Sequence, residues 1–326
     1  METTQQTTEL KSILVKEYGL NDRCDIQKIK SGLSNDNYLV SDSQNKFVAR
    51  IARFAVPNQT TNMVEIMLFA ENNAIKIVPR LIKTVTGQPY THIENSPLFL
   101  MSFISGESGK LDTMTTEKIT SVGKALAEFH SLSWQPKTES KTLDPHYIFE
   151  VYNNFFPKLN DVQFSEKEYF LSLVEKEAKY FLDNKLDELN KLPKGILHND
   201  LIPENIMFSK HDEVEAFIDL EEVGYGIMLL DLGRVLSYWF FDPILNEYNI
   251  ENAKIFLESY ETVRKLSEEE KDALELATRF IAFRHSVYVG KLLYEKKLQT
   301  IRDISDFQNF EYLINHKLNL FPVLPQ

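Results

Sequence analysis

Cysteine and long apolar runs are scarce in this 326-residue sequence. A single cysteine, Cys24, excludes an intramolecular disulfide framework, and no Cys/His cluster has the spacing of a zinc site. No segment reaches the ~18 uninterrupted apolar residues of a membrane span, and the N-terminus lacks a basic segment followed by an apolar run. These absences predict a cytoplasmic protein without a membrane partner.

Basic residues are fewer than acidic ones: the sequence has 36 Lys and Arg and 48 Asp and Glu, which gives a net charge of −12. Nucleic-acid affinity is built mostly from clustered cationic side chains, so this balance predicts no nucleic-acid partner. The acidic field favours cationic ligands instead. With 43% hydrophobic and 26% charged residues, the composition is that of a globular protein large enough for two lobes. The oligomeric state stays open between a monomer and a homodimer.

The first hundred residues predict a lobe that consists of a sheet with one or two helices. An opening helix is expected over 8–18, ended by Gly19, and another over 60–74. Short β-like runs between turn-forming residues predict strands at 25–30, 38–41, 46–53, 78–85, 88–93 and 97–104. The first three strands should form an antiparallel meander. We therefore predict an N-terminal lobe over 1–104.

The pattern changes to long helices after Ser105-Gly-Glu-Ser-Gly109, which predicts a hinge. Helices are expected over 115–132, 147–157, 165–190, 228–243, 250–264, 267–295 and 303–318. The exception is 195–219, where short strands and tight loops interrupt helical sequence, and such local exceptions often mark functional sites. A mainly α lobe is thus predicted over 105–326, and the whole chain is predicted to be an α+β protein.

The exceptional region contains His198-Asn-Asp-Leu-Ile-Pro-Glu-Asn205, followed by Phe217-Ile-Asp219. Phosphoryl transfer to an alcohol requires a carboxylate near the hydroxyl and oxygen ligands for Mg²⁺ on the phosphates. The spacing is that of a kinase catalytic loop, so Asp200 is the predicted base and Asn205 a predicted metal ligand. Asp219 ends a strand-like run that should return it beside Asn205, which makes it the second predicted ligand.

These motifs resemble those of the family that includes choline kinases, homoserine kinases and aminoglycoside phosphotransferases. The resemblance covers nearly the whole chain, since Gly224-Tyr-Gly226, Asp231-Leu-Gly233 and the helix at 122–130 also match. It implies a bilobal protein-kinase-like fold, with ATP and Mg²⁺ as cofactors, and transfer of the γ-phosphoryl group to a hydroxyl. In this setting, His198 and Asp231 are expected to brace the catalytic loop.

The nucleotide side is less typical of kinases. The loop 31–38 resembles the loop that this family places over the nucleotide phosphates, but it contains one glycine. Arg50 occupies the strand position at which the family places Lys or Arg, and Glu65 on the next predicted helix is its expected ion-pair partner. The segment before the hinge is expected beside the adenine. The residues predicted to contact the nucleotide are Ser34, Asn35, Arg50, Glu65, Met101 and Phe103.

The predicted acceptor is a small molecule that carries an amine. About a dozen residues separate Asp219 from Asp231, which leaves no room for the activation segment of a protein kinase. Carboxylates and aromatic rings suit an ammonium group, and arginines suit a substrate carboxylate. The residues assigned to the acceptor are Glu221, Glu222, Tyr238, Trp239, Arg279 and Arg284, although aromatic residues at helical spacing more often belong to the core.

The sequence gives an order of candidate acceptors but does not decide between them. The helices after residue 256 resemble homoserine kinases, whereas the loop 31–38 and the catalytic segment look more like choline or ethanolamine kinases. An amino acid or amino alcohol comes first, with homoserine slightly ahead of choline, and an aminoglycoside or amino sugar comes third. The alternative from another class is a catalytically silent kinase-like binding module, because the phosphate loop is poor in glycine and Arg50 stands where lysine is common.

Overall fold

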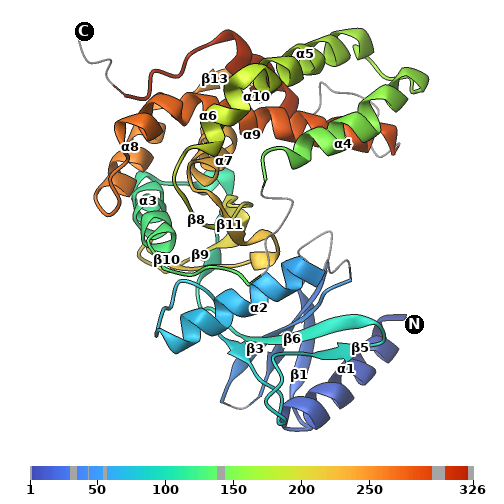
Figure 1. Cartoon of the computed structure of the whole chain (residues 1–326). Coiled ribbons are helices and arrows are strands. Elements are labelled where there is room, and N and C mark those ends of the chain that lie inside the picture. Colours follow the sequence, from blue (N-terminus) through green and yellow to red (C-terminus); the bar gives the residue numbers. More distant parts are fainter. Residues whose placement is uncertain are drawn as a thin grey trace.

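The computed structural model describes residues 2–29, 35–42, 44–53, 57–137, 144–295 and 305–321. In this part of the chain a sheet-rich region comes first and a helix-rich region follows it (Figure 1). Figure 1 shows the sheet-rich region, coloured blue to cyan, below the helix-rich region, coloured green to red. The lobe boundary at 104/105 stays a prediction.

Within the described residues, the sheet-rich region contains a six-stranded antiparallel sheet with the order β1-β2-β3-β6-β4, in which β5 also pairs with β6. The first three strands form the predicted meander. The elements are α1 (Glu2–Tyr18), β1 (Asp25–Ile29), β2 (Asp36–Ser41), β3 (Lys46–Ile51), α2 (Pro57–Asn72), β4 (Leu81–Ile82), β5 (Thr91–Ile93) and β6 (Ser96–Ser102). The strand predicted over 78–85 is reduced to β4, since Pro79 has no N–H group for a ladder.

Alternation along β6 supplies apolar side chains to both faces of this sheet. Leu98 and Leu100 belong to the buried cluster that includes α1, whereas Phe99 and Met101 belong to the cluster that includes α2. Successive side chains of a strand point to opposite faces, so one apolar strand can bury both helices. Helix α2 lies on the side of the sheet nearest the helix-rich region (Figure 1).

The helices after the hinge lie close to their predicted positions. They are α3 (Thr116–His130), α4 (Tyr147–Phe155), α5 (Lys167–Tyr180), α6 (Leu186–Asn190), α7 (Leu229–Trp239), α8 (Ile250–Glu261), α9 (Glu268–Tyr294) and α10 (Ser305–Asn315). Thr115, Asn249 and Ser267 cap α3, α8 and α9 with side-chain oxygens that accept N–H groups of the first turn. The helix predicted over 165–190 is divided by a π-helical turn at Phe181–Lys185.

Short strands also occur within the helix-rich region, where the sequence predicted them only within 195–219. β8 pairs with β11, β9 pairs with both β10 and β7, and β12 pairs with β13. Their bounds are β7 (Glu107–Ser108), β8 (Lys194–Leu197), β9 (Ile206–Phe208), β10 (Val214–Phe217), β11 (Gly224–Ile227), β12 (Phe241–Asp242) and β13 (Glu247–Tyr248). The predicted hinge thus forms a strand, β7, on the edge of β9.

Two glycines allow the hinge to lie against the segment that follows the catalytic motif. Gly106 has a φ of +140°, and a Cβ atom there would lie 2.3 Å from the carbonyl oxygen of Phe208. A Cβ atom at Gly109 would lie 2.5 Å from the carbonyl oxygen of Pro203. The Gly109 N–H donates to the carbonyl oxygen of Ile206 at 3.0 Å. The connection between the two regions is therefore anchored to the predicted catalytic loop.

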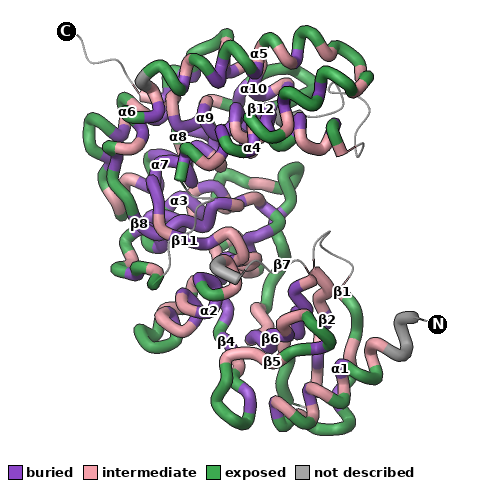
Figure 2. The backbone as a smooth tube through the Cα atoms, turned by 45° about the vertical axis from the view of Figure 1, so that its right-hand side comes forward, coloured by how far each residue is buried: buried purple, intermediate pink, exposed green. Residues whose placement is uncertain are grey.

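Most of the buried residues lie in the helix-rich region, where Figure 2 shows them along α3, α7 and β8. Helix α9 contributes a row of buried side chains that includes Phe280, Phe283 and Val287. This packing gives α7 and α9 a fixed position beside the β8–β9 loop. In the described ranges, no helix is both long enough and apolar enough to cross a membrane.

Candidate active site

The predicted catalytic loop, residues 198–205, is held from behind by Asp231 in the first turn of α7. Asp231 is 1% exposed, and its carboxylate accepts the backbone N–H groups of His198 and Asn199, both at 2.7 Å. His130, the last residue of α3, approaches the same carboxylate at 3.2 Å through Nε2. Burial raises the pKa of Asp231, but the contacts with His130 and His198 outweigh burial and lower it. A buried, charged carboxylate thus fixes the start of the loop.

His198 is fully buried beneath the loop. Its Nε2 donates a hydrogen bond to the carbonyl oxygen of Ile218 at 2.9 Å, and its ring lies edge-on to Phe217 with centroids 5.9 Å apart. These two partners immediately precede Asp219. The side chain therefore links the catalytic loop to the segment of the second predicted metal ligand, which is the kind of contact expected of a bracing residue.

Asp200 lies on this loop, and 40% of its side chain is exposed. Arg234 on α7 donates from Nη2 to Oδ1 at 3.1 Å, and Asn205 donates from Nδ2 to Oδ2 at 3.3 Å. The Arg234 guanidinium also lies over the ring of Tyr238, 4.8 Å from its centroid. These neighbours orient the carboxylate while leaving it accessible to a small molecule.

The sequence predicts no role for Arg234. Its position offers one clue, because Arg234 follows Asp231 by three residues on the same helix, and residues at this spacing lie on one face. If Asp231 holds the catalytic loop, a long cationic side chain one turn later lies within reach of Asp200. Helical spacing could therefore have identified this residue once Asp231 was assigned.

Asn205 and Asp219 present the oxygen atoms expected of metal ligands. Asn205 uses Nδ2 for hydrogen bonds to Asp200, including one to its carbonyl oxygen at 2.9 Å, which leaves Oδ1 as an acceptor. The Ile218 N–H donates to the carbonyl oxygen of Asn205 at 2.8 Å, so the two segments are adjacent. Asp219 has a φ of +61°, a conformation that non-glycine residues adopt at a cost and that is common at functional sites.

The donor set at these two residues fits Mg²⁺ on a nucleotide. Among the residues that the structure describes, no group of three or more His, Cys, Asp or Glu side chains is placed to hold a metal ion. Mg²⁺ needs no such cage, because it usually takes one or two protein oxygens and completes its shell with phosphate oxygens and water. One amide oxygen and one carboxylate meet that requirement.

Arg50 on β3 reaches across from the sheet-rich region to the same place. Its Nη2 lies 2.7 Å from Oδ1 of Asp219 and 2.9 Å from Oε1 of Glu221. Asn35 donates from Nδ2 to the same Glu221 oxygen at 2.8 Å. Two predicted nucleotide contacts therefore converge on two carboxylates of the opposite region. Ser34 lies outside the described residues.

The predicted ion pair between Arg50 and Glu65 is wrong. Glu65 on α2 accepts the backbone N–H of Lys137 at 3.1 Å, and its other oxygen lies 3.5 Å from the Lys137 Nζ. Arg50 is 6% exposed, and two carboxylates on one side stabilise such a guanidinium better than a single carboxylate on the other. Glu65 is thus a link between α2 and the segment after α3.

The two residues predicted beside the adenine lie at the end of β6 and just beyond it. Met101 is buried at 9% exposure and pairs with Val48 of β3. Phe103 donates its N–H to the carbonyl oxygen of Lys46 at 3.4 Å, and the Lys46 ammonium lies 5.5 Å from its ring centroid. Both residues therefore lie where the sheet joins the hinge, and their contact with a nucleotide stays a prediction.

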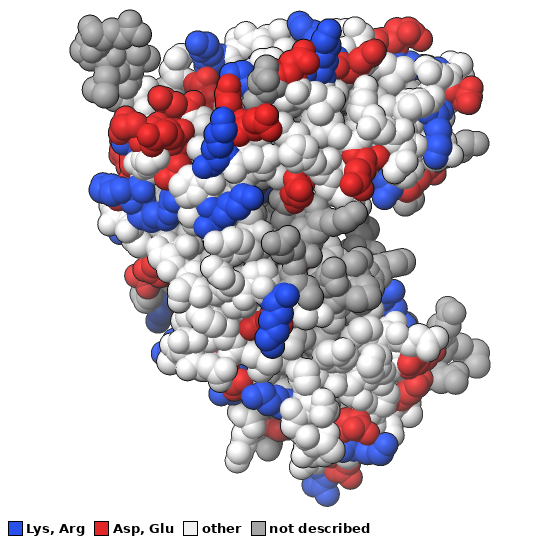
Figure 3. Space-filling model, in the orientation of Figure 1, with Lys and Arg blue, Asp and Glu red and all other residues white. Residues whose placement is uncertain are grey.

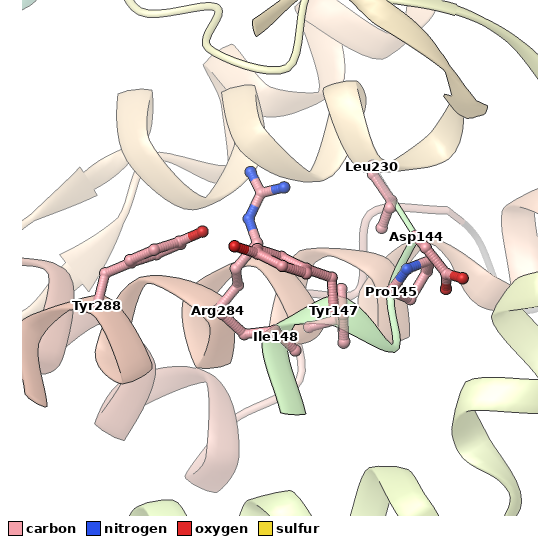
Figure 4. A pocket seen from close by; sticks show the side chains of 8 residues that line it. Asp144, Pro145, Tyr147, Ile148, Leu230, Arg284 and Tyr288 are labelled. Carbon is pink, nitrogen blue, oxygen red and sulfur yellow. The ribbon is translucent and has the colours of Figure 1, made fainter. Parts of the chain in front are cut away.

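A pocket lies between α4, α7 and α9 (Figure 4). Its lining includes Arg284 and Tyr288 of α9 and Tyr147 of α4. Arg284 donates from Nη1 to Oδ1 of Asn199 at 2.9 Å, which connects the pocket to the residue before Asp200. Figure 4 shows the hydroxyl ends of Tyr147 and Tyr288 directed toward one another, with the Arg284 guanidinium extending above them, and the carboxylate of Asp144 also lines the pocket.

Glu222 lies at the end of the turn formed by Leu220–Glu222. Its Oε1 accepts a hydrogen bond from Nε2 of Gln59 on α2 at 2.9 Å. Burial raises the pKa of Glu222, whereas Arg284 acts in the opposite direction. The hydrogen bond from Gln59 thus links this turn to α2.

Two residues assigned to the acceptor lie elsewhere, and both assignments are corrected. Trp239 is 7% exposed and donates from Nε1 to the carbonyl oxygen of Leu201 at 3.1 Å, so it supports the loop from the core. Arg279 forms a two-fold ion pair with buried Glu177, with Nη2 and Oε2 2.6 Å apart. Because five residues of helix rotate the side-chain direction by about 140° relative to Arg284, the two arginines point to different surroundings.

Comparison with known proteins places this geometry in a family. Residues 25–266 match the model of the phosphotransferase enzyme family. The homoserine kinase of Methylobacillus flagellatus is 22% identical over 311 residues, which cover 93% of this chain and 91% of that protein. The match confirms the predicted resemblance and the prediction of a phosphotransferase.

Solved structures agree with the predicted fold. The microcompartment-associated aminopropanol kinase superposes with a TM-score of 0.68 at 18% identity, over 94% of both chains. A choline/ethanolamine kinase family protein from Mesorhizobium loti gives a TM-score of 0.68 at 14% identity, over 97% of this chain and 95% of the other. The predicted α+β, protein-kinase-like fold is confirmed. Since the family model covers most of its length, the chain belongs to the phosphotransferase enzyme family.

Proposed function

We propose that this protein transfers the γ-phosphoryl group of ATP to a hydroxyl of a small molecule, and that the acceptor is an amino acid or an amino alcohol. One observation carries the proposal: Asp200 is partly exposed on a loop whose backbone is hydrogen-bonded to buried Asp231, with Asn205 on the same loop and Asp219 on the adjoining segment. The related proteins are named for homoserine, aminopropanol and choline or ethanolamine, which are small alcohols that carry nitrogen.

The mechanism follows from the charges around Asp200. The acceptor hydroxyl approaches this carboxylate, which orients it and accepts its proton as the oxygen attacks the phosphorus in line. Arg234 and Asn205 hold the two carboxylate oxygens in place during the attack. Arg50 exchanges its carboxylate partners for phosphate oxygens. Mg²⁺, when bound by Asn205 and Asp219, supplies positive charge to the phosphate oxygens. The transfer is direct and needs no phosphorylated protein side chain.

Homoserine ranks first among the acceptors, ahead of choline and ethanolamine, and an aminoglycoside or amino sugar ranks third. This order rests on the homoserine kinase relative, whose alignment extends over nearly the whole chain. It also rests on Arg284, which offers a partner for a carboxylate that choline and ethanolamine lack.

The test is a screen of Mg²⁺-dependent ADP formation with homoserine, other hydroxy amino acids, choline, ethanolamine, amino sugars and aminoglycosides. We expect an amino acid or amino alcohol to stimulate ADP release, with homoserine the best of them. No ATP consumption with any acceptor would favour a silent binding module. Phosphate transfer to a protein, but to no small alcohol, would favour a protein kinase.

A further inference from the structure

The fold brings a cation to Asp200 that the catalytic loop itself does not supply. The loop His198-Asn-Asp-Leu-Ile-Pro-Glu-Asn205 contains no lysine or arginine, and Asp200 is followed by the apolar residues Leu201 and Ile202. The cation comes from α7 instead, where Arg234 donates from Nη2 to Oδ1 of Asp200 at 3.1 Å. The positive charge beside the proposed base therefore depends on the packing of α7 and not on the loop.

Arg234 lies on the one open face of α7. All residues of this helix are buried except Arg234 and Tyr238, which are four residues apart and so lie on the same face. The side chain of Arg234 is 11% exposed. On the face of the molecule that Figure 3 shows, by contrast, acidic and basic side chains are interspersed at the surface. Arg234 is thus set into the wall of the site, unlike the surface cations of that figure.

Three neighbours fix the direction of the Arg234 guanidinium. Besides Asp200, these are His285 of α9, whose Nδ1 accepts from Nη1 at 3.3 Å, and the ring of Tyr238, whose centroid lies 4.8 Å away. Burial, together with Arg234 and Arg284, holds the pKa of His285 well below its usual value, so this imidazole is neutral at pH 7. In the described residues, Asp200 is the one carboxylate at ion-pair distance from Arg234.

These contacts leave donors of the guanidinium unused. A guanidinium carries five N–H groups in one plane, two of them on each Nη atom, so Nη1 and Nη2 each keep a second donor. The Nε atom is buried and has no hydrogen-bond partner among the described residues. The protein therefore does not satisfy this guanidinium fully. Arg234 can hold Asp200 and bind a second anion at the same time.

The phosphoryl group in transfer is an anion that must come to this place. A hydroxyl that is hydrogen-bonded to Asp200 lies ~2.7 Å from the carboxylate, and the phosphorus that it attacks lies ~3–3.5 Å farther. The phosphoryl oxygens thus approach a carboxylate of the same sign, which is unfavourable unless a cation lies beside both. Arg50 supplies positive charge next to Asp219, but in the described chain Arg234 is the one cation at ion-pair distance from Asp200.

We propose that Arg234 is a catalytic residue that contacts the phosphoryl group during transfer, with one N–H on Asp200 and another on a phosphoryl oxygen. This inference rests on the proposed function, because it concerns the same transfer. The bond from the acceptor oxygen to phosphorus forms while the bond from phosphorus to the ADP oxygen breaks, and the hydroxyl proton goes to Asp200. Arg234 makes and breaks no covalent bond. Its charge and hydrogen bonds favour the transition state over the bound reactants.

The first experiment is steady-state kinetics with homoserine and ATP. Arg234→Met should lower kcat by on the order of 10²–10³-fold and change KM for either substrate by less than about fivefold, because the lost contact belongs to the transition state. Arg234→Lys keeps the charge without the planar fork and should lie between this variant and the wild type. A rise in KM for homoserine with kcat unchanged would overturn the inference, since Arg234 would then bind the acceptor.

Arg279→Lys is the matched control. Arg279 also pairs with a carboxylate, that of Glu177, and lies over the ring of Tyr180, 4.2 Å from its centroid, but it lies away from the site. This variant should keep the wild-type kcat. Melting temperatures establish that each variant is folded, and Arg234→Lys decides if Arg234→Met is not.

A double-mutant cycle separates contact with the phosphoryl group from support of Asp200. In the Asp200→Asn background, the carboxylate that Arg234 orients is gone. If Arg234 also contacts the phosphoryl group, Arg234→Met should lower the residual kcat by a further factor of about 10 or more. If Arg234 acts only by orienting Asp200, the double variant is as active as Asp200→Asn alone, and the inference is overturned.

Binding of a phosphoryl mimic gives a readout without turnover and without a known acceptor. Calorimetry compares ADP and Mg²⁺ with ADP, Mg²⁺ and aluminium fluoride, which takes the place of the phosphoryl group. We expect aluminium fluoride to tighten ADP binding to the wild type and to Arg279→Lys. Arg234→Met should lose about 10-fold or more of that gain, with the affinity for ADP alone changed by less than about threefold.

The outcomes separate this inference from the proposed function. A gain from aluminium fluoride that is equal in the wild type and in Arg234→Met, or absent from the wild type, overturns the inference and leaves the kinase activity intact. If the gain depends on Arg234 but no small alcohol is phosphorylated, the proposed acceptor class fails while the contact of Arg234 with the phosphoryl position holds.

Discussion

The two walls of the candidate site are held together in different ways. The acceptor wall is the loop 198–205, whose backbone is fixed by the buried carboxylate of Asp231. The nucleotide wall depends on side chains of Arg50 and Asn35 that meet Asp219 and Glu221, whose side chains are 42% and 30% exposed. Buried, fully paired groups hold one geometry, whereas the buried Arg50 pairs with carboxylates that water also reaches, which weakens these ion pairs. The acceptor wall is therefore the more firmly held of the two, and we expect the contacts of the nucleotide wall to be the ones that change when a nucleotide binds.

The support of the acceptor wall continues away from the site. His130 meets the Tyr260 hydroxyl at 2.8 Å through Nδ1, and Arg264 donates to the same hydroxyl at 3.2 Å. Arg264 also pairs with Glu270 of the α9 capping box at 2.7 Å. The catalytic loop is thus connected through α3 and α8 to the start of α9, and the nucleotide wall has no comparable buried chain in the described residues.

The largest expected effect on turnover comes from a substitution of Asp200, on the acceptor wall. Asp200→Asn should lower turnover by on the order of 10²–10⁴, because the positioned base is lost, while ATP affinity changes little. Asp187→Asn on the exposed part of α6 is a control of the same chemistry. Near-normal turnover of Asp200→Asn would remove this residue from the mechanism.

A substitution of Asp231 tests whether the buried carboxylate holds the acceptor wall in place. Asp231→Asn replaces one acceptor oxygen by an NH₂ group that faces one of the two backbone donors, and it removes the buried negative charge, so unfolding by urea should show a loss of about 2–4 kcal/mol. Turnover should fall as well, because the loop loses its support. If Asp231→Asn left the urea midpoint of unfolding unchanged, the hydrogen bonds of Asp231 to the loop would not contribute to stability.

Arg50 tests the nucleotide wall. Arg50→Met should raise KM for ATP by on the order of 10- to 100-fold, since a charge-assisted contact to phosphate is lost. The free energy of unfolding should change less than in Asp231→Asn, because the carboxylate partners of Arg50 are exposed to water. If the loss of stability equals that of Asp231→Asn, the contrast between the walls does not hold.

The smallest effect is expected at Glu65. Glu65→Gln should change KM for ATP by less than about threefold, because Glu65 pairs with Lys137, whose side chain is 85% exposed, and not with Arg50. An effect as large as that of Arg50→Met would instead place an Arg50–Glu65 ion pair in the nucleotide-bound protein.

The fold and the acceptor wall could be predicted because their determinants are local. Apolar periodicity gave the helices and strands close to their observed bounds, and the spacing of Asp200 and Asn205 depends on one short loop. Backbone contacts of that loop bring it to Asp231, which the sequence also indicated. Continuous segments thus determine most of this wall.

Side-chain partners across the two regions could not be predicted in the same way. Whether Arg50 meets Glu65 or Asp219 depends on how α2 and the segment after β10 lie relative to β3, which no local pattern specifies. Arg279 and Arg284 are similar in sequence context, and only the packing of α9 against Glu177 separates their roles. Long, flexible side chains choose partners that the tertiary fold supplies.

The most direct test of the central claim is phosphorus NMR of homoserine, ATP and Mg²⁺ incubated with the wild-type protein and with Asp200→Asn. The account predicts that a phosphomonoester of the acceptor appears in step with ADP in the wild type and is strongly slowed in Asp200→Asn. ADP accompanied only by inorganic phosphate, or an equal rate of phosphomonoester formation in both proteins, would contradict it.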